Sequence, residues 1–183
     1  LCLMLALDLQ KRVSLDALRA NHAALAAFID ANFLLSLLLF MAAYTAVVAI
    51  ALPGSLTLSI AGGSLFGAVI GAVATCISAT AGAALTFLAA RSALGDVLRG
   101  FVQGKLSRFE SGFRRDAFHY LVALRLMPGA PFFIVNIVPA FLGVSLRVFV
   151  LATFIGIIPA TFVFCAVGAG LSAALAADAA HRA

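Results

Sequence analysis

Arg125 is the residue best suited to chemistry, because it stands with Asn136 inside the otherwise apolar stretch 124–136. A guanidinium stays charged at any working pH and can bind a phosphate through two parallel hydrogen bonds. Ionisable residues at membrane depth are costly and are therefore functional candidates. We predict that Arg125 and Asn136 bind the substrate. Two structural alternatives stay open: Arg125 extends to the interface or binds loop carbonyls, and Asn136 satisfies hairpin carbonyls.

The sequence offers no catalytic set. His22, His119 and His181 are far apart and follow no metal-ligand pattern. The pair Gly62-Gly63 is not followed by Lys or Thr at the spacing of a phosphate-binding P-loop. We therefore expect no enzyme activity, no cofactor and no metal site.

Composition indicates an integral membrane protein. The chain has 183 residues, of which 64% are hydrophobic and 10% charged, and its mean hydropathy is +1.18. Neither 31–90 nor 148–177 contains an Asp, Glu, Lys, Arg or His, and each exceeds the roughly 20 residues that cross a bilayer. The net charge of +5 is typical of basic residues that set topology and contact anionic lipid, so we expect lipids and not nucleic acid as partners.

The hydropathy pattern predicts an all-α, multi-pass fold. Apolar segments long enough to cross lie at 33–52, 68–90 and 148–171, the last with Pro159 in its middle. Small residues on 68–90 predict close packing against another helix. We assign 1–30 to a trimmed first transmembrane helix and an interfacial helix, 31–171 to the membrane domain, and 172–183 to a tail.

A basic segment, 91–116, separates the second and third crossings. Six of the 12 basic residues fall in it, and its apolar residues recur at helical spacing. We read this segment as a second interfacial amphipathic helix on the cytoplasmic side.

Two segments, 53–67 and 127–143, are too rich in Gly, Pro and hydroxyl residues for lipid-facing helices. Proline breaks a helix, and irregular backbone at membrane depth must face protein or water. We predict that both are re-entrant hairpins; for 53–67 the alternative is a kinked helix with small-residue packing. The predicted architectural residues are Pro53, Gly54, Gly62, Gly63, Gly67, Pro128, Gly129, Pro131 and Gly143.

The two segments belong to a weak internal repeat. A Pro-Gly pair, an aromatic-Gly exit at Phe66-Gly67 or 141–143, and a long apolar segment follow one another twice at nearly the same spacing. An odd number of crossings between the hairpins would make them enter from opposite faces. We therefore predict two inverted repeats, each a re-entrant hairpin plus a transmembrane helix, with the site near the midplane.

Several blocks of sequence resemble one family. The segments 52–54, 61–67, 87–91, 125–132 and 156–161 are similar in order and spacing to the VTT domain of the DedA-like superfamily, also called the SNARE-associated Golgi protein family. The resemblance covers about residues 45–171. It implies two facing re-entrant loops and lipid scrambling or polyprenyl-phosphate flipping, with some bacterial members tied to proton-motive-force homeostasis.

The resemblance also bears on the site. Arg125 matches the family's essential Arg, and Arg91 ends its Phe-x-x-x-Arg/Lys element, so we add Arg91 to the predicted substrate-binding residues. Two departures, the absence of acidic residues from 31 to 90 and Pro131 in place of a second Arg, favour the TVP/TMEM-like branch.

We therefore expect a lipid-moving protein in which Arg125 contacts the phosphate. The alternatives are an ion- or proton-coupled transporter of small solutes, and a non-transporting scaffold that works through the basic segment. Ala and Gly richness favours a bacterial plasma membrane, and a homo-oligomer stays open.

Overall fold

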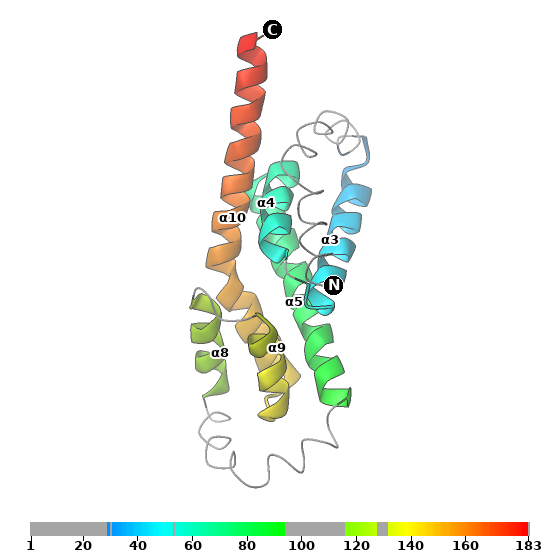
Figure 1. The fold of residues 1–183 in the computed structure, drawn as a ribbon, viewed down its shortest axis with the longest axis vertical. Coiled ribbons are helices and arrows are strands. Elements are labelled where there is room, and N and C mark those ends of the chain that lie inside the picture. Colours follow the sequence, from blue (N-terminus) through cyan, green and yellow to red (C-terminus); the bar gives the residue numbers. More distant parts are fainter. Residues whose placement is uncertain (1–28, 30, 53, 94–115, 128–131, 183) are drawn as a thin grey trace, which may run out of the picture.

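The computed structural model describes residues 29, 31–52, 54–93, 116–127 and 132–182. These residues form six helices and no strand, as predicted (Figure 1). The helices are α3 (Phe33–Ala49), α4 (Ser55–Phe66), α5 (Ala68–Ala93), α8 (Ala117–Leu126), α9 (Phe132–Phe141) and α10 (Leu146–Arg182).

Two long apolar helices, α5 and α10, form the centre of the bundle. They pack side by side, and the buried rings of Phe87 and Phe149 stack between them with their centroids 4.5 Å apart. In the described part of the chain, Ala68–Ser92 and Leu146–Ala177 are the two stretches long and apolar enough to cross a membrane. The predicted helices at 68–90 and 148–171 are thus confirmed, and α10 runs on through Pro159 and into the segment predicted as a tail.

The predicted crossing at 33–52 is shorter than expected. Helix α3 has 17 residues, or about 26 Å at 1.5 Å per residue, which is less than the roughly 30 Å hydrocarbon thickness. The helix ends at Ile50, and the next residue, Ala51, has φ 54°, outside the helical region. The chain then turns into α4, so that α3 and α4 together form a first helical hairpin (Figure 1).

The prediction that 53–67 is itself a hairpin is therefore wrong, because this segment is the second arm of the first hairpin. Helix α4 fills it from Ser55 to Phe66. The described residues of 127–143 are similar: α9 (132–141) is a single helix that forms the second arm of a second hairpin, and α8 forms the first arm. Gly and hydroxyl residues did not break these arms, because the neighbouring helices supply close packing that compensates for poor helix propensity.

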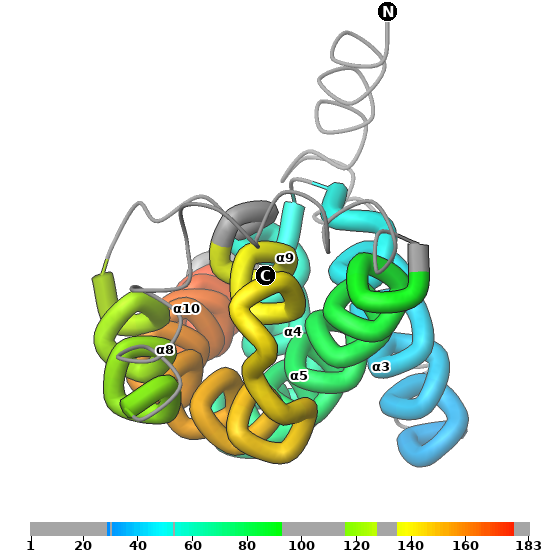
Figure 2. The backbone as a smooth tube through the Cα atoms, turned by 90° about the horizontal axis from the view of Figure 1, so that it is seen from below, coloured from blue at the N-terminus to red at the C-terminus, as the bar shows by residue number. Residues whose placement is uncertain are grey.

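The two arms of each hairpin pack against different members of the central pair, α5 and α10. Helix α3 packs on α5 and α8 on α10, whereas the second arms cross over, α4 to α10 and α9 to α5. Figure 2 shows the result along the bundle: α3 and α8 lie at opposite edges. Each long helix is thus held by arms of both hairpins, and the α3–α4 pair and the α8–α9 pair approach each other near the middle of the bundle (Figure 1).

Glycine ends both second arms. Gly67 has φ 80° and Gly143 has φ 69°, a left-handed conformation that residues with a Cβ rarely adopt. Each glycine lets the chain reverse directly from the short second arm into a long helix. This shared geometry accounts for the aromatic-Gly pattern of the sequence.

Small residues place α4 close to both long helices. A Cβ on Gly63 would collide with the backbone of Cys165 in α10, and a Cβ on Gly71 would lie 2.6 Å from the carbonyl oxygen of Gly62. The predicted small-residue packing of 68–90 is confirmed, and so is the packing part of the alternative for 53–67.

The outside of the bundle is apolar. Leu34 in α3 is 67% exposed and Val163 in α10 is 60% exposed, and many other large apolar side chains of both helices share this surface. Large contiguous apolar surfaces are rare on soluble monomers and mark contact with a membrane or a partner. The predicted interfacial helices, in 1–30 and 91–116, lie almost wholly outside the described residues.

Candidate functional site

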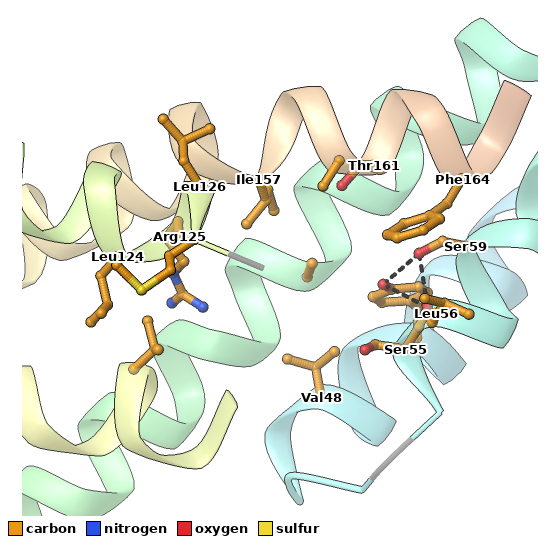
Figure 3. A pocket seen from close by; sticks show the side chains of 15 residues that line it. Val48, Ser55, Leu56, Ser59, Leu124, Arg125, Leu126, Ile157, Thr161 and Phe164 are labelled. Atoms are coloured by element: carbon orange, nitrogen blue, oxygen red, sulfur yellow. Dashed lines mark hydrogen bonds between the residues drawn. The ribbon is translucent and has the colours of Figure 1, made fainter. Parts of the chain in front are cut away.

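A cavity of about 470 Å³ lies between the end of α8 and the beginning of α4, beside α10 (Figure 3). Its volume is within the range of small-molecule sites, roughly 300–1,000 Å³. Both hairpins and both long helices contribute to its walls. The lining residues are Tyr44, Val48, Ser55, Leu56, Ser59, Ala79, Leu124, Arg125, Leu126, Met127, Val135, Ile157, Ala160, Thr161 and Phe164.

Arg125 brings one charge to this cavity, and its side-chain partners are neutral. Its Nη2 donates to Oδ1 of Asn136 at 2.6 Å and to Oγ1 of Thr153 at 3.0 Å. Asn136 is completely buried and Thr153 is 2% exposed. One guanidinium thus links α8, α9 and α10, and no carboxylate among the cavity's lining residues offsets its positive charge.

The rest of the Arg125 side chain lies along one face of α10. A Cβ on Gly156 would come within 2.6 Å of the Cβ of Arg125, so only a glycine allows α8 this close approach. The guanidinium carbon lies 5.7 Å from the centroid of the Phe149 ring, within the range of a cation–π contact. Phe149, Thr153 and Gly156 recur at the i, i+4, i+7 spacing of one helix face.

Two buried donors of this cluster have no hydrogen-bond partner among the described residues. They are Nε of Arg125 and Nδ2 of Asn136. A buried donor without an acceptor costs about 1–3 kcal/mol. Since the two donors belong to residues that are themselves hydrogen-bonded to each other, the cluster is suited to an acceptor with several oxygens, such as a phosphate, or to ordered water.

Opposite Arg125 in Figure 3 lies a cluster of hydroxyl groups from the first hairpin. Ser59 Oγ donates to the carbonyl oxygen of Ser55 at 2.8 Å. The Tyr44 hydroxyl lies 3.2 Å from that carbonyl, to which it can donate, and 3.0 Å from Ser59 Oγ. We call Tyr44, Ser55 and Ser59 the hydroxyl cluster; it joins α3 to α4 near their turn.

A hydrogen bond also connects the hydroxyl cluster to α10. The Sγ of Cys165 donates to the carbonyl oxygen of Ser59 at 3.2 Å. Tyr44 and Ser59 are only 3% and 4% exposed, and both are among the residues that line the cavity.

The predicted site residues separate into three groups. Arg125 lines the cavity and is hydrogen-bonded to the fully buried Asn136, whereas Arg91 is exposed near the end of α5 and does not line the cavity. Gly62 and Gly63 pack between helices, while Gly54, Gly67 and Gly143 lie at helix ends. Four predicted prolines and glycines, Pro53, Pro128, Gly129 and Pro131, lie outside the described residues.

Sequence reasoning missed several residues of the site. Thr153, Phe149 and Gly156 lie in an apolar segment that reads as an ordinary crossing, and no local signal marks them. Tyr44 did carry a signal: a phenol inside an apolar run needs a hydrogen-bond partner, and the hydroxyl-rich segment after Pro53 offers one. In the part of the chain that the structure describes, no group of His, Cys, Asp or Glu could hold a metal ion.

A helical bundle with an apolar exterior, two long apolar helices and a charged residue at an open cavity between helices is typical of an integral membrane protein. The model of the VTT domain family matches residues 52–170, which is most of the described membrane domain. The chain belongs to the VTT domain family, within the DedA-like superfamily. This match confirms the family resemblance of the sequence.

Curated relatives carry the name Transmembrane protein 41. The chain is 34% identical over 150 residues to the Transmembrane protein 41 homolog of Dictyostelium discoideum, covering 80% of this chain and 44% of that protein. It is 28% identical to Transmembrane protein 41B of Xenopus tropicalis and 26% identical to that of Homo sapiens, each over 160 residues, covering 86% of this chain and 58% and 55% of the relatives. The chain thus spans about half the length of the curated relatives it matches.

These names support the predicted TVP/TMEM-like branch. Because the relatives are eukaryotic, the bacterial plasma membrane stays a prediction. No solved structure matches the chain.

Proposed function

We propose that this protein moves phospholipids or polyprenyl phosphates across the bilayer, with Arg125 contacting the phosphate. In this proposal the two hairpins are re-entrant and inverted with respect to each other. The head group passes through the cavity between the hairpins while the acyl or prenyl chains stay in lipid.

One observation carries the proposal: a permanently charged guanidinium lies at an open cavity between helices and is bound to neutral partners, Asn136 and Thr153. In an arginine paired with a carboxylate, the positive charge would be balanced within the protein and would attract an anionic ligand less strongly. Arg125 keeps its charge, and the unpaired donors on Nε and on the Asn136 amide favour an anionic, oxygen-rich ligand.

The cavity wall supports an amphiphile and not a free ion. Exposed apolar side chains, Leu56, Leu126 and Met127, border the same cavity as Arg125. A charged head group can therefore reach the guanidinium while apolar chains leave along the apolar outer surface. Nothing in this arrangement makes a small-solute transporter or a scaffold a better explanation than lipid movement.

The test is lipid exchange in vesicles that contain the purified protein and a trace of phospholipid labelled on its acyl chain. A membrane-impermeant reductant destroys outer-leaflet label, so the label lost beyond half reports movement between leaflets. We expect movement in the wild type and a loss of at least about tenfold for Arg125→Ala, the equivalent of about 1.4 kcal/mol. Arg147→Ala is the matched control, because Arg147 is exposed and lies outside the cavity.

Arg125→Lys separates charge from geometry. Lysine keeps the positive charge but lacks the planar fork that holds Asn136, Thr153 and a phosphate together, so we expect an intermediate rate. Wild-type vesicles without lipid movement would refute the proposal. Full activity of a folded Arg125→Ala protein would remove Arg125 from it.

A further inference from the structure

The two ends of the cavity differ in hydrogen-bond character. The Arg125 end offers donors, since a guanidinium has five N–H groups and no acceptor. Asn136, which is fully buried behind it, holds the guanidinium through Oδ1. This end takes acceptors, which in a phospholipid are the phosphate oxygens. The opposite end has the reverse character.

At the hydroxyl cluster, the hydroxyl hydrogens of Tyr44 and Ser59 are already used in hydrogen bonds within the cluster. Ser59 donates to the Ser55 carbonyl, and Tyr44 donates to the same carbonyl or to Ser59 Oγ. The hydroxyl oxygens of Tyr44 and Ser59 therefore have only lone pairs left to offer a ligand. A ligand group that needed a donor here would break an internal bond and leave the Ser55 carbonyl with fewer partners, whereas a ligand that brings its own N–H or O–H breaks nothing.

We propose that Tyr44 and Ser59 select the head group, favouring phospholipids whose head carries N–H or O–H donors over those with a quaternary ammonium. The inference rests on the proposed function and names the substrate class of the same cavity. Ethanolamine and glycerol heads carry N–H or O–H donors in addition to the phosphate oxygens. Choline offers the phosphate but no N–H.

Electrostatics agrees with this selection. A quaternary ammonium is best stabilised by carboxylates or by a cage of aromatic faces. The cavity's lining residues include no carboxylate and only two aromatic rings, Tyr44 and Phe164, which are fewer than the several faces of a cage. A primary ammonium or a hydroxyl is better served, because directional hydrogen bonds to Tyr44 and Ser59 replace part of its hydration.

The test compares phospholipids that share acyl chains and label and differ only in the head group: ethanolamine, glycerol and choline. In vesicles with the wild-type protein we expect the ethanolamine and glycerol lipids to move roughly three- to tenfold faster than the choline lipid, the effect of about one hydrogen bond. Tyr44→Phe and Ser59→Ala each remove one hydroxyl and should reduce this ratio toward one. Tyr120→Phe, on the exposed side of α8, is the matched control and should keep the wild-type ratio.

The outcomes separate the two proposals. Lipid movement without head-group preference, or a preference that survives in both variants, would overturn the selection and leave lipid movement standing. If the choline lipid moved fastest, and moved equally fast with Tyr44→Phe, head-group selection would be assigned to the ring face of Tyr44 and not to its hydroxyl. No movement of any lipid by the wild type would overturn both. If Tyr44→Phe fails to fold, Ser59→Ala decides, because it leaves the Tyr44–Ser55 bond in place.

Discussion

Arg125 and Asn136 are joined by a hydrogen bond of 2.6 Å from Nη2 to Oδ1, although they belong to opposite arms of one hairpin. The bond uses the only acceptor of the amide and leaves its NH₂ unpaired among the described residues. Asn136 therefore does two things: it positions the guanidinium, and it adds a second donor beside it. Both properties can be tested separately.

Asn136→Asp is the sharpest test of the retained charge. A carboxylate keeps the acceptor for Arg125 but neutralises the guanidinium and removes the second donor. We expect the thermal stability of the protein to be kept while lipid movement falls by about tenfold or more. If Arg125 served only to hold the helices together, the exchange rate of this variant would match that of the wild type.

Gly156→Ala tests the positioning of Arg125. The added methyl would lie 2.6 Å from the Cβ of Arg125, so α8 must move away from α10 or the arginine must leave its partners. We expect slower lipid movement and a loss of stability of about 1–3 kcal/mol. Gly170→Ala, with nothing within 4 Å of the added carbon, is the control, and equal behaviour of the two variants would contradict the prediction.

Gly63→Ala tests the packing of the first hairpin. Its Cβ would collide with the backbone of Cys165, which cannot rotate away as a side chain can. We expect a lower melting temperature and greater protease cleavage between α3 and α5 than in the wild type. An unchanged melting temperature would show that α4 does not sit against α10 in the membrane.

Cysteine labelling tests whether the cavity is open to water. In a background without native cysteines, Leu56→Cys and Met127→Cys place thiols on the cavity wall, and Val163→Cys places one on the apolar exterior of α10. A polar maleimide needs a thiolate in water. We expect labelling at 56 and 127 at least about fivefold faster than at 163. Equal rates at the three positions would refute a wet cavity between the hairpins.

The sequence alone indicated an integral membrane protein and singled out Arg125 as its candidate charged site. Two long spans without ionisable residues indicate a membrane environment, and an arginine surrounded by Pro, Gly and apolar residues is a functional candidate. Residues 68–90 and 148–171 were recognised as long helices because hydropathy over 20 residues is a property of composition, which folding does not change.

Only the tertiary structure decided which segments pair. The arms of the hairpins, α3 with α4 and α8 with α9, were misjudged because helix propensity penalises Gly and Ser locally, while the packing that overrides this penalty comes from distant helices. Thr153, Phe149 and Gly156 joined the site for the same reason. Their role comes from the close approach of α8 to α10, and that contact depends on residues roughly thirty positions apart in the chain, beyond the reach of any local pattern.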